Sequence, residues 1–399
     1  MANDRDGIVK SIVHSVHRVD GTDARLVLTS RKLGTLHVDG WKRVTEAIKR
    51  NIEIEALLLG DNDLTRISDE CWEMLSDAIT CNEKITRIGL GTNRLSMLSL
   101  GACRHLANAI GHGNLRDINL LNNDVARLPA KHWSILTQAI KDNTNIQVLN
   151  LSGNDMSALF EGNDLQRWEL LVEAIKSSTT GGIDELRFMD CNMGSLPVGA
   201  WEMFTAVLAR CKYLDLSYNP SLSLMPLQAW REVATAIERN QQLGTLRLQF
   251  CNLGFNTLTK GVKVDVRMGK EAAPRHGTIT ADQTYDNRKS STAKIGHGIY
   301  TVKFKGGSTQ RVKSGSIIPV LAVGDRVATT RDNEGSTLFE ATVVAMRTGS
   351  TVEVKFADGG ARCMVEKSKL KPISEAVWRE LGPGLARCKA LEKLLLEQE

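Results

Sequence analysis

The sequence predicts an elongated α/β solenoid of strand-and-helix units on one parallel sheet, with an all-β module inserted near the C-terminal end. Three observations predict it. An apolar pattern ending in Asn recurs about every 31 residues, Trp recurs at one position of the same unit, and the interval between the two expands once, from 10 residues to 127. Such a period indicates a repeat architecture, in which neighbouring units bury a shared apolar core.

The first half of each unit follows the spacing LxxLxLxxNxL. The first clear copy has Ile54, Leu57, Leu59, Asn62 and Leu64 at these positions. The Asn position is then filled, in order, by Asn93, Asn123, Asn154, Cys191, Asn219 and Cys251, and a degenerate opening copy has Leu26, Leu28 and Leu33 with Arg31 at the Asn position. We expect the leucines to point into the solenoid and the Asn side chains to bond backbone groups where each strand turns.

The second half of each unit is predicted to be a helix. A Trp is followed six residues later by an Ala-Ile type pair, as in Trp41 with Ala47 and Ile48. The other Trp residues of this position are Trp72, Trp133, Trp168, Trp201, Trp230 and Trp378, and Cys103 fills it in the remaining unit. We expect these indoles to pack between helices, where truncation costs roughly 3–5 kcal/mol.

Both halves together resemble the leucine-rich-repeat family, in its ribonuclease-inhibitor-like class. The resemblance covers residues 24–254 and returns at 375–396. It implies that strand side chains lying between the buried leucines line a concave binding face. These are Val27 and the candidate partner-binding residues Leu58, Gly89, Asn119, Asn150, Arg187, Asp215 and Arg247. The early end of this row is apolar and the later end is charged, which suits a polypeptide with an apolar and a charged portion.

The interval from Cys251 to Trp378 contains an insert of about 117 residues. Residues 255–373 hold 20 Lys and Arg against 11 Asp and Glu, whereas the rest of the chain holds 31 against 35. Short alternating apolar segments separated by Gly-rich turns predict strands in this insert. We therefore expect an N-terminal cap at 1–20, repeats at 21–254, a basic insert at 255–373 and a final repeat segment at 374–399.

Each half of the insert resembles a Tudor or agenet-type SH3-like barrel, on the order GxxV, a middle strand, xVxFxDG and a closing xxxIxP. The first half also resembles a KOW motif. Tudor domains bind methylated Lys or Arg in an aromatic cage. The candidate cage residues are Tyr300 and Phe304 in the first half and Phe339, Phe356 and Asp358 in the second. Thr330 lies where a further cage aromatic is expected, so packing in the barrel core is the alternative for these aromatic residues.

The basic residues of the insert offer a second kind of site. Lys303, Lys305 and Arg311 cluster on one predicted hairpin, where they could contact phosphates of a nucleic acid or an acidic protein. Few aromatic residues are available for base stacking. A solvated basic surface without a ligand is the remaining alternative.

Motifs of catalysis are missing from the sequence: it has no P-loop, no GxGxxG and no HExxH. The eight Cys residues form no CxxC pair, and we expect no metal, no cofactor and reduced thiols. The sequence has neither a signal-peptide pattern nor an apolar run of about 18 residues, which favours a soluble intracellular protein, cytoplasmic or nuclear. Some leucine-rich-repeat proteins activate small GTPases, an alternative that the resemblance brings with it.

The last residues, 394–399, begin another strand without a polar cap. Exposed strand edges favour association. We expect a partner, or further chain, to cover this end.

Overall fold

The structure is a computed structural model that describes residues 2–19, 24–112, 114–160, 165–177, 183–251, 253 and 376–396, together with the strands of 263–372. In those strands, side chains are described for Glu353, Val354, Arg362 and Met364. The chain divides into two compact parts, each larger than a single repeat unit. One holds residues 1–217, 232–247 and 384–395, and the other holds 218–231, 248–383 and 396–399.

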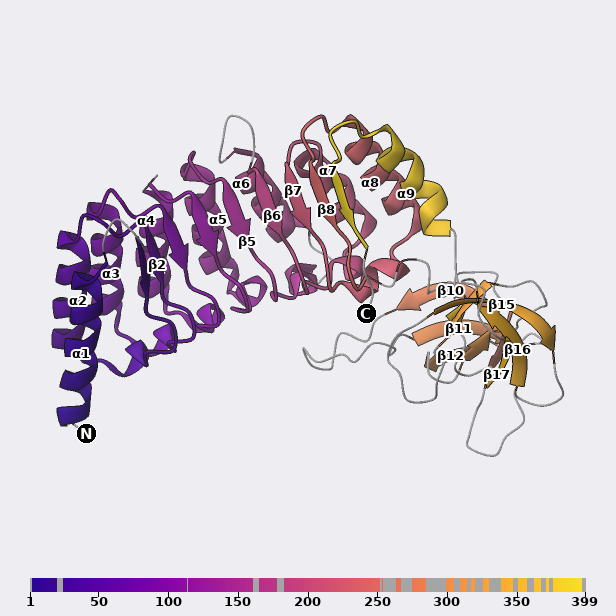
Figure 1. The fold of residues 1–399 in the computed structure, drawn as a ribbon, viewed down its shortest axis with the longest axis horizontal. Coiled ribbons are helices and arrows are strands. Elements are labelled where there is room, and N and C mark those ends of the chain that lie inside the picture. The colour runs from indigo at the N-terminus through magenta and orange to yellow at the C-terminus, as the bar shows by residue number, and fades with distance from the viewer. Residues whose placement is uncertain are drawn as a thin grey trace. The chain divides into compact units, whose positions relative to one another are not determined.

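Nine strands form one parallel sheet in the first compact part of the chain (Figure 1). They are β1 (Arg25–Val27), β2 (Ala56–Leu58), β3 (Arg87–Gly89), β4 (Asp117–Asn119), β5 (Val148–Asn150), β6 (Glu185–Arg187), β7 (Tyr213–Asp215), β8 (Thr245–Arg247) and β19 (Lys393–Leu395). The order in the sheet is the order in the chain. This is the repeated strand of the predicted solenoid.

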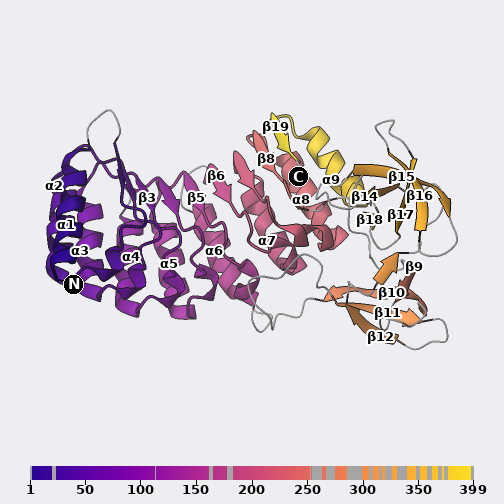
Figure 2. The same cartoon turned by 60° about the horizontal axis from the view of Figure 1, so that its bottom comes forward.

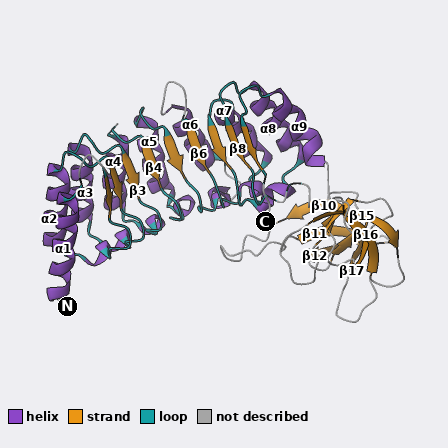
Figure 3. Ribbon diagram, in the orientation of Figure 1, coloured by secondary structure: helices purple, strands orange, loops and turns teal. Residues whose placement is uncertain are grey.

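A helix follows each of these strands up to β8, and the helices form a second row beside the strands (Figure 3). They are α2 (Val38–Arg50), α3 (Asp69–Cys81), α4 (Leu100–Gly111), α5 (Ala130–Asp142), α6 (Gln166–Ser177), α7 (Val198–Leu208), α8 (Leu227–Arg239) and α9 (Ala376–Arg387). In addition, α1 (Ala2–His17) precedes the first strand and packs on α2, with Val9, Ile12 and Val16 buried.

A short 3₁₀ helix lies between strand and helix in seven of the units, a feature that the repeat spacing does not announce. These are η1 (Leu33–Thr35), η2 (Leu64–Arg66), η3 (Leu95–Met97), η4 (Val125–Arg127), η5 (Met156–Phe160), η6 (Met193–Ser195) and η7 (Pro220–Leu224). η5 is five residues long and ends with Leu159 and Phe160. Leu159 is buried, which favours continuing the turn, and residues 161–164 lie outside the described part.

The predicted core is confirmed at the repeat positions. In the first clear copy Ile54, Leu57 and Leu59 are fully buried, and the described Trp side chains, all but Trp378, are at most 2% exposed. The indole nitrogens of Trp72, Trp133 and Trp168 each donate to a backbone carbonyl. In the units that have it and whose side chains are described, the Trp ring is therefore part of the buried core.

Asn side chains tie each unit to the one before it at the end of the strand. Asn93 Oδ1 accepts from the backbone N–H of Asn62 and Leu64, at 2.9 and 3.4 Å, and its Nδ2 donates to the carbonyls of Leu59 and Leu90 at 3.0 and 2.9 Å. Asn62, Asn123 and Asn154 repeat this geometry. In the same position, the Cys191 thiol reaches the Leu151 carbonyl at 3.1 Å.

A second set of Asn side chains does the same after four of the described helices. Asn82 Nδ2 donates to the carbonyls of Ile48 and Asn51 at 2.8 and 2.7 Å, and its Oδ1 accepts from the Lys84 N–H. Asn51, Asn143 and Asn240 make corresponding bonds, and Cys211 and Cys388 occupy the position in two other units. These Asn residues bond each of their units to the element before it.

The last repeat segment joins the solenoid after the insert. β19 pairs in parallel with β8, with Leu394 opposite Leu246, and α9 lies beside α8 (Figure 2). Arg231 pairs with Glu380 at 2.7 Å, and Arg387 pairs with Glu238 at 3.1 Å. The chain therefore returns to its sheet after more than a hundred residues.

The insert consists of two five-stranded antiparallel sheets, in the orders β12-β11-β10-β9-β13 and β17-β16-β15-β14-β18. The first contains β9 (Lys263–Val266), β10 (Arg275–Thr284), β11 (Ile299–Phe304), β12 (Thr309–Lys313) and β13 (Ile317–Pro319). The second contains β14 (Arg326–Thr329), β15 (Phe339–Met346), β16 (Thr351–Phe356), β17 (Arg362–Glu366) and β18 (Lys371–Pro372). In both, four strands form a meander and the fifth returns to the first.

We predict that Asn93→Ala lowers the free energy of unfolding by about 2–4 kcal/mol, because it leaves buried backbone donors and acceptors without partners. Asn93→Cys should lose less, since Cys191 and Cys251 occupy equivalent positions. Chemical denaturation followed by circular dichroism measures both. The control Glu73→Ala, on an exposed position of α3, should stay within about 0.5 kcal/mol of the parent. An Asn93→Ala protein as stable as this control would contradict the bonding role.

We predict that Gly384→Ala loosens the last unit, whereas Gly382→Ala does not. A Cβ at Gly384 would lie 2.3 Å from the Ala234 carbonyl oxygen, but a Cβ at Gly382 meets nothing within 4 Å. Hydrogen–deuterium exchange of residues 384–395 should rise in the first variant and stay the same or fall in the second. Equal exchange in both would show that α9 does not pack closely on α8.

Candidate functional site

The candidate partner-binding residues come together in one row across the sheet. The strand register pairs Leu58 with Gly89, Gly89 with Asn119, and Asn119 with Asn150. The row continues through Arg187 and Asp215 to Arg247, and it begins at Val27. All eight hold the third strand position, so their side chains follow each other on the face of the sheet away from the buried leucines. We call this the strand face.

The row is unevenly accessible. Val27 is half exposed, and Leu58, Asn119, Arg187 and Arg247 are partly exposed. Gly89, Asn150 and Asp215 are buried among their neighbours. A partner on the strand face would therefore meet an apolar beginning and a charged end, with recessed positions between them.

Three of the polar residues also serve the fold. The side-chain oxygens of Asn119, Asn150 and Asp215 accept the backbone N–H two residues later, at 3.0, 3.0 and 2.9 Å. This Asx turn shapes the chain as it leaves the strand. The guanidinium groups of Arg187 and Arg247 have no acceptor atom for such a bond, and both side chains stay partly exposed on the strand face.

The charged end forms a bonded cluster over β6, β7 and β8. Arg187 pairs with Glu185 of its own strand, and its guanidinium lies 5.8 Å from the centre of the Tyr213 ring. Arg247 Nη1 lies 3.2 Å from the Tyr213 hydroxyl and 3.6 Å from Asp215 Oδ2. The side chains of Arg187 and Arg247 stay 43% and 36% exposed, so each guanidinium is oriented by the protein and still reachable. Arg and Tyr are the residue types most enriched at binding hot spots.

Asp117 lies in the neighbouring row, at the first position of β4. Burial raises the pKa of its carboxyl group, against the opposing effect of Arg87 and Arg187. Its charged form is therefore incompletely compensated in the free protein. Sequence reasoning missed this residue, together with Glu185 and Tyr213, because it considered the third strand position first.

Sequence reasoning also missed an aromatic pair. The rings of Tyr218 and Phe250 stack with centroids 4.4 Å apart, and Tyr218 is 48% exposed. Both residues have positive φ, at 58° and 57°, a conformation that bulky side chains seldom adopt. The equivalent residues of earlier units are Ser30, Asp61, Thr92, Asn122, Gly153 and Asp190. The signal was present in the repeat register, since only these two units place a ring there.

The candidate residues of the insert are placed only by their backbone. Tyr300, Lys303 and Phe304 lie in β11, and Arg311 lies in β12 opposite Thr301. Phe339 begins β15 and Phe356 ends β16. Lys305 and Asp358, the other two predicted binding residues, lie outside the described residues. The two halves therefore have the predicted strands, and their side-chain sites stay predictions.

The described cysteines form no disulfide with one another. Burial raises the pKa of Cys103 to about 11 and of Cys211 to about 12, and it raises that of Cys191 further. A thiol with a raised pKa is a poor nucleophile near neutral pH. Across the described residues, no group of three or more His, Cys, Asp or Glu side chains is arranged to hold a metal ion.

Comparison with known proteins gives only structural likenesses. No protein-family model matches the chain, and no curated protein matches it. Among solved structures, the leucine-rich repeat-containing protein LegL7 of Legionella pneumophila is similar over 60% of this chain and 70% of its own, with 17% identity and a TM-score of 0.45.

Two further solved structures match a smaller part. The actin-binding site 2 of leiomodin-1 covers 41% of this chain and 87% of its own, with 16% identity and a TM-score of 0.30. The tropomodulin C-terminal domain of Caenorhabditis elegans covers 43% and 92%, with 14% identity and a TM-score of 0.31. At TM-scores below 0.5 these likenesses do not decide the fold, which rests on the repeated units themselves.

Among the helices of the described residues, none combines the length and the apolar character that crossing a bilayer requires.

Proposed function

We propose that this protein is a non-catalytic scaffold that binds a polypeptide partner on the strand face of a leucine-rich-repeat solenoid of the ribonuclease-inhibitor-like class. The observation that carries the proposal is the unbroken row from Val27 to Arg247. It aligns one residue per unit over eight adjacent strands, and five of these residues keep partly exposed side chains. Repeat arrays use such surfaces to bind extended ligands.

The chemistry of the row indicates the partner's character. Val27 and Leu58 offer apolar contact at the early end, whereas Arg187 and Arg247 offer oriented guanidinium groups at the later end. A partner with apolar side chains followed by acidic ones complements this order. Reduced thiols at the described cysteines favour the cytoplasm or nucleus as its location.

The experiment compares the partners that copurify with the full chain and with Arg187→Ala/Arg247→Ala, identified by mass spectrometry. We predict that the double variant loses at least one partner, by about tenfold in recovery, because truncating a hot-spot Arg costs 2 kcal/mol or more. Thermal unfolding of both proteins checks that the variant is folded.

The matched control is Arg104→Ala, which removes an exposed guanidinium from helix α4 on the opposite side of the units. The control should keep every partner of the parent. If the strand-face variant and this control recover the same partners, the strand face is not the binding surface.

A second function rests on the insert. We propose that each five-stranded sheet closes into a Tudor- or agenet-like SH3-type barrel and that the module reads nucleic acid or acidic protein. Two observations favour it. The fifth strand returns to the first in both sheets, as in small barrels, and residues 255–373 carry nine more positive than negative charges.

We predict that the full chain binds single-stranded or double-stranded nucleic acid at 50 mM salt and that its affinity falls about 10³-fold or more at 200 mM salt. The variant Lys303→Glu/Lys305→Glu/Arg311→Glu should not bind. Fluorescence anisotropy measures this, with polyglutamate and methylated histone peptides as further probes. The control Lys42→Glu/Lys49→Glu/Lys141→Glu places the same charge change on exposed helix positions. Absence of binding to every probe at 50 mM salt would remove the reader function.

A further inference from the structure

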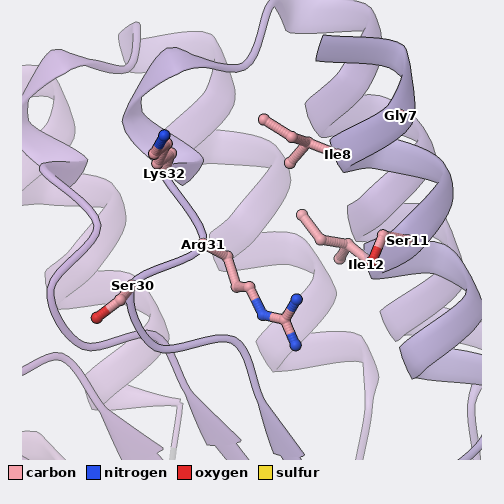
Figure 4. A pocket seen from close by; sticks show the side chains of 7 residues that line it. All are labelled: Gly7, Ile8, Ser11, Ile12, Ser30, Arg31 and Lys32. Carbon is pink, nitrogen blue, oxygen red and sulfur yellow. The ribbon is translucent and has the colours of Figure 1, made fainter. Parts of the chain in front are cut away.

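A pocket of about 390 Å³ lies between α1 and the loop that follows β1. Figure 4 shows Ile8 and Ile12 pointing from α1 toward the loop, with Arg31 extending from the loop toward α1. Gly7 and Ser11 of α1 complete one wall, and Ser30 and Lys32 complete the other. The pocket has the size of a small-molecule or single-side-chain site.

The pocket lies at the first repeat, which α1 precedes in place of another strand and helix. In the next units, the side chain at this position is an Asn, which is buried and bonded to the preceding unit, as Asn62 is to the Leu28 carbonyl. The equivalent Arg31 is exposed. Its backbone N–H is still held by Asn62 Oδ1 at 2.8 Å, so the side chain leaves a fixed point of the loop.

The positive charge at the pocket is not neutralised by the described part of the chain. No hydrogen bond or ion pair joins the side chain of Arg31 or Lys32 to another described residue. Asp6 of α1 is bonded to Lys10 at 2.9 Å and Arg43 at 2.8 Å. Asp61 accepts the Ser30 hydroxyl at 2.6 Å. Among the described residues, the two cations at this pocket therefore have no carboxylate bonded to them.

Most backbone N–H groups of the loop cannot bind a ligand together with the two cations, because they are already hydrogen-bonded. The N–H groups of Ser30, Leu33 and Gly34 already donate to the second unit, at 3.0, 3.2 and 2.8 Å. A phosphate site usually needs such a set of N–H groups. A carboxylate needs fewer donors, because the planar guanidinium binds its two oxygens in parallel.

We propose that this pocket binds an aliphatic carboxylate, with the carboxylate on Arg31 and Lys32 and the aliphatic part on the partly exposed Ile8. The ligand is either the C-terminal residue of a polypeptide or a free branched carboxylic acid, which share this chemistry. The site is separate from the strand face and does not depend on the function proposed above.

The test uses the full chain and saturation-transfer NMR with N-acetyl-leucine, 4-methylpentanoate, N-acetyl-leucinamide and inorganic phosphate. Both carboxylates should bind, whereas the amide should bind at least about tenfold more weakly, the amount that one charge-assisted bond of roughly 1.4 kcal/mol supplies. Stronger binding of N-acetyl-leucine identifies a chain terminus, and stronger binding of 4-methylpentanoate identifies a free acid.

Two variants and one control locate the binding. Arg31→Gln should lower the affinity about tenfold, and Ser11→Trp, at an exposed position of the wall, should block the pocket while keeping both cations. Arg94→Gln changes an exposed residue at the position of Lys32 two units later and should bind as the parent does. The assignment is overturned if the amide binds as well as the acid, if phosphate binds more tightly, if no probe binds, or if Arg31→Gln retains full affinity.

Discussion

The solenoid depends on satisfying backbone groups at two buried turns in every unit. A strand of three residues followed by a 3₁₀ turn leaves N–H and C=O groups facing an apolar interior, where each unpaired group costs about 1–3 kcal/mol. The side-chain amide of Asn offers a donor and an acceptor at once, so a single residue can pair groups on its own unit and on the previous one. Asn93 does this after the strand and Asn82 after the helix.

The cysteines follow from the same constraint. Cys191 and Cys251 replace Asn after the strand, and Cys211 and Cys388 replace it after the helix. A thiol provides one weak donor, and it fits a buried position because Cys behaves as a small apolar residue. Burial also raises the pKa of the Cys191 and Cys211 thiols. The buried thiols are therefore part of the repeat and do not constitute a separate reactive site.

Periodicity allowed most of the fold of the solenoid to be predicted, because each position of the repeat occurs several times in the sequence. The leucine positions, the Trp position and the strand-end Asn could all be read from the register, and their burial agrees with the prediction. The Asn residues that follow the helices, such as Asn51 and Asn82, were not predicted to bond the preceding unit. An Asn is common after a helix whether or not it bonds to a neighbouring repeat. The 3₁₀ turns were missed because a turn of three to five residues is too short to show an apolar periodicity of its own. In the insert, alternation placed the strands, but a pattern without repeats does not fix which side chains meet.

The candidate site shows where position in a repeat ceases to determine role. Asn119, Asn150 and Arg187 share one row, yet the first two bond their own turns, whereas Arg187 is directed by Glu185 and Tyr213. An Asn in this row is sufficiently explained by the fold. Arg187 and Arg247 are not, because their charged groups bond to Glu185, Tyr213 and Asp215 on the strand face. Arg31 is a similar departure in the first repeat, where the side chain is exposed while the Asn of later repeats is buried. In a repeat protein, the residues that differ from the structural role of their position are the ones through which recognition can be specific.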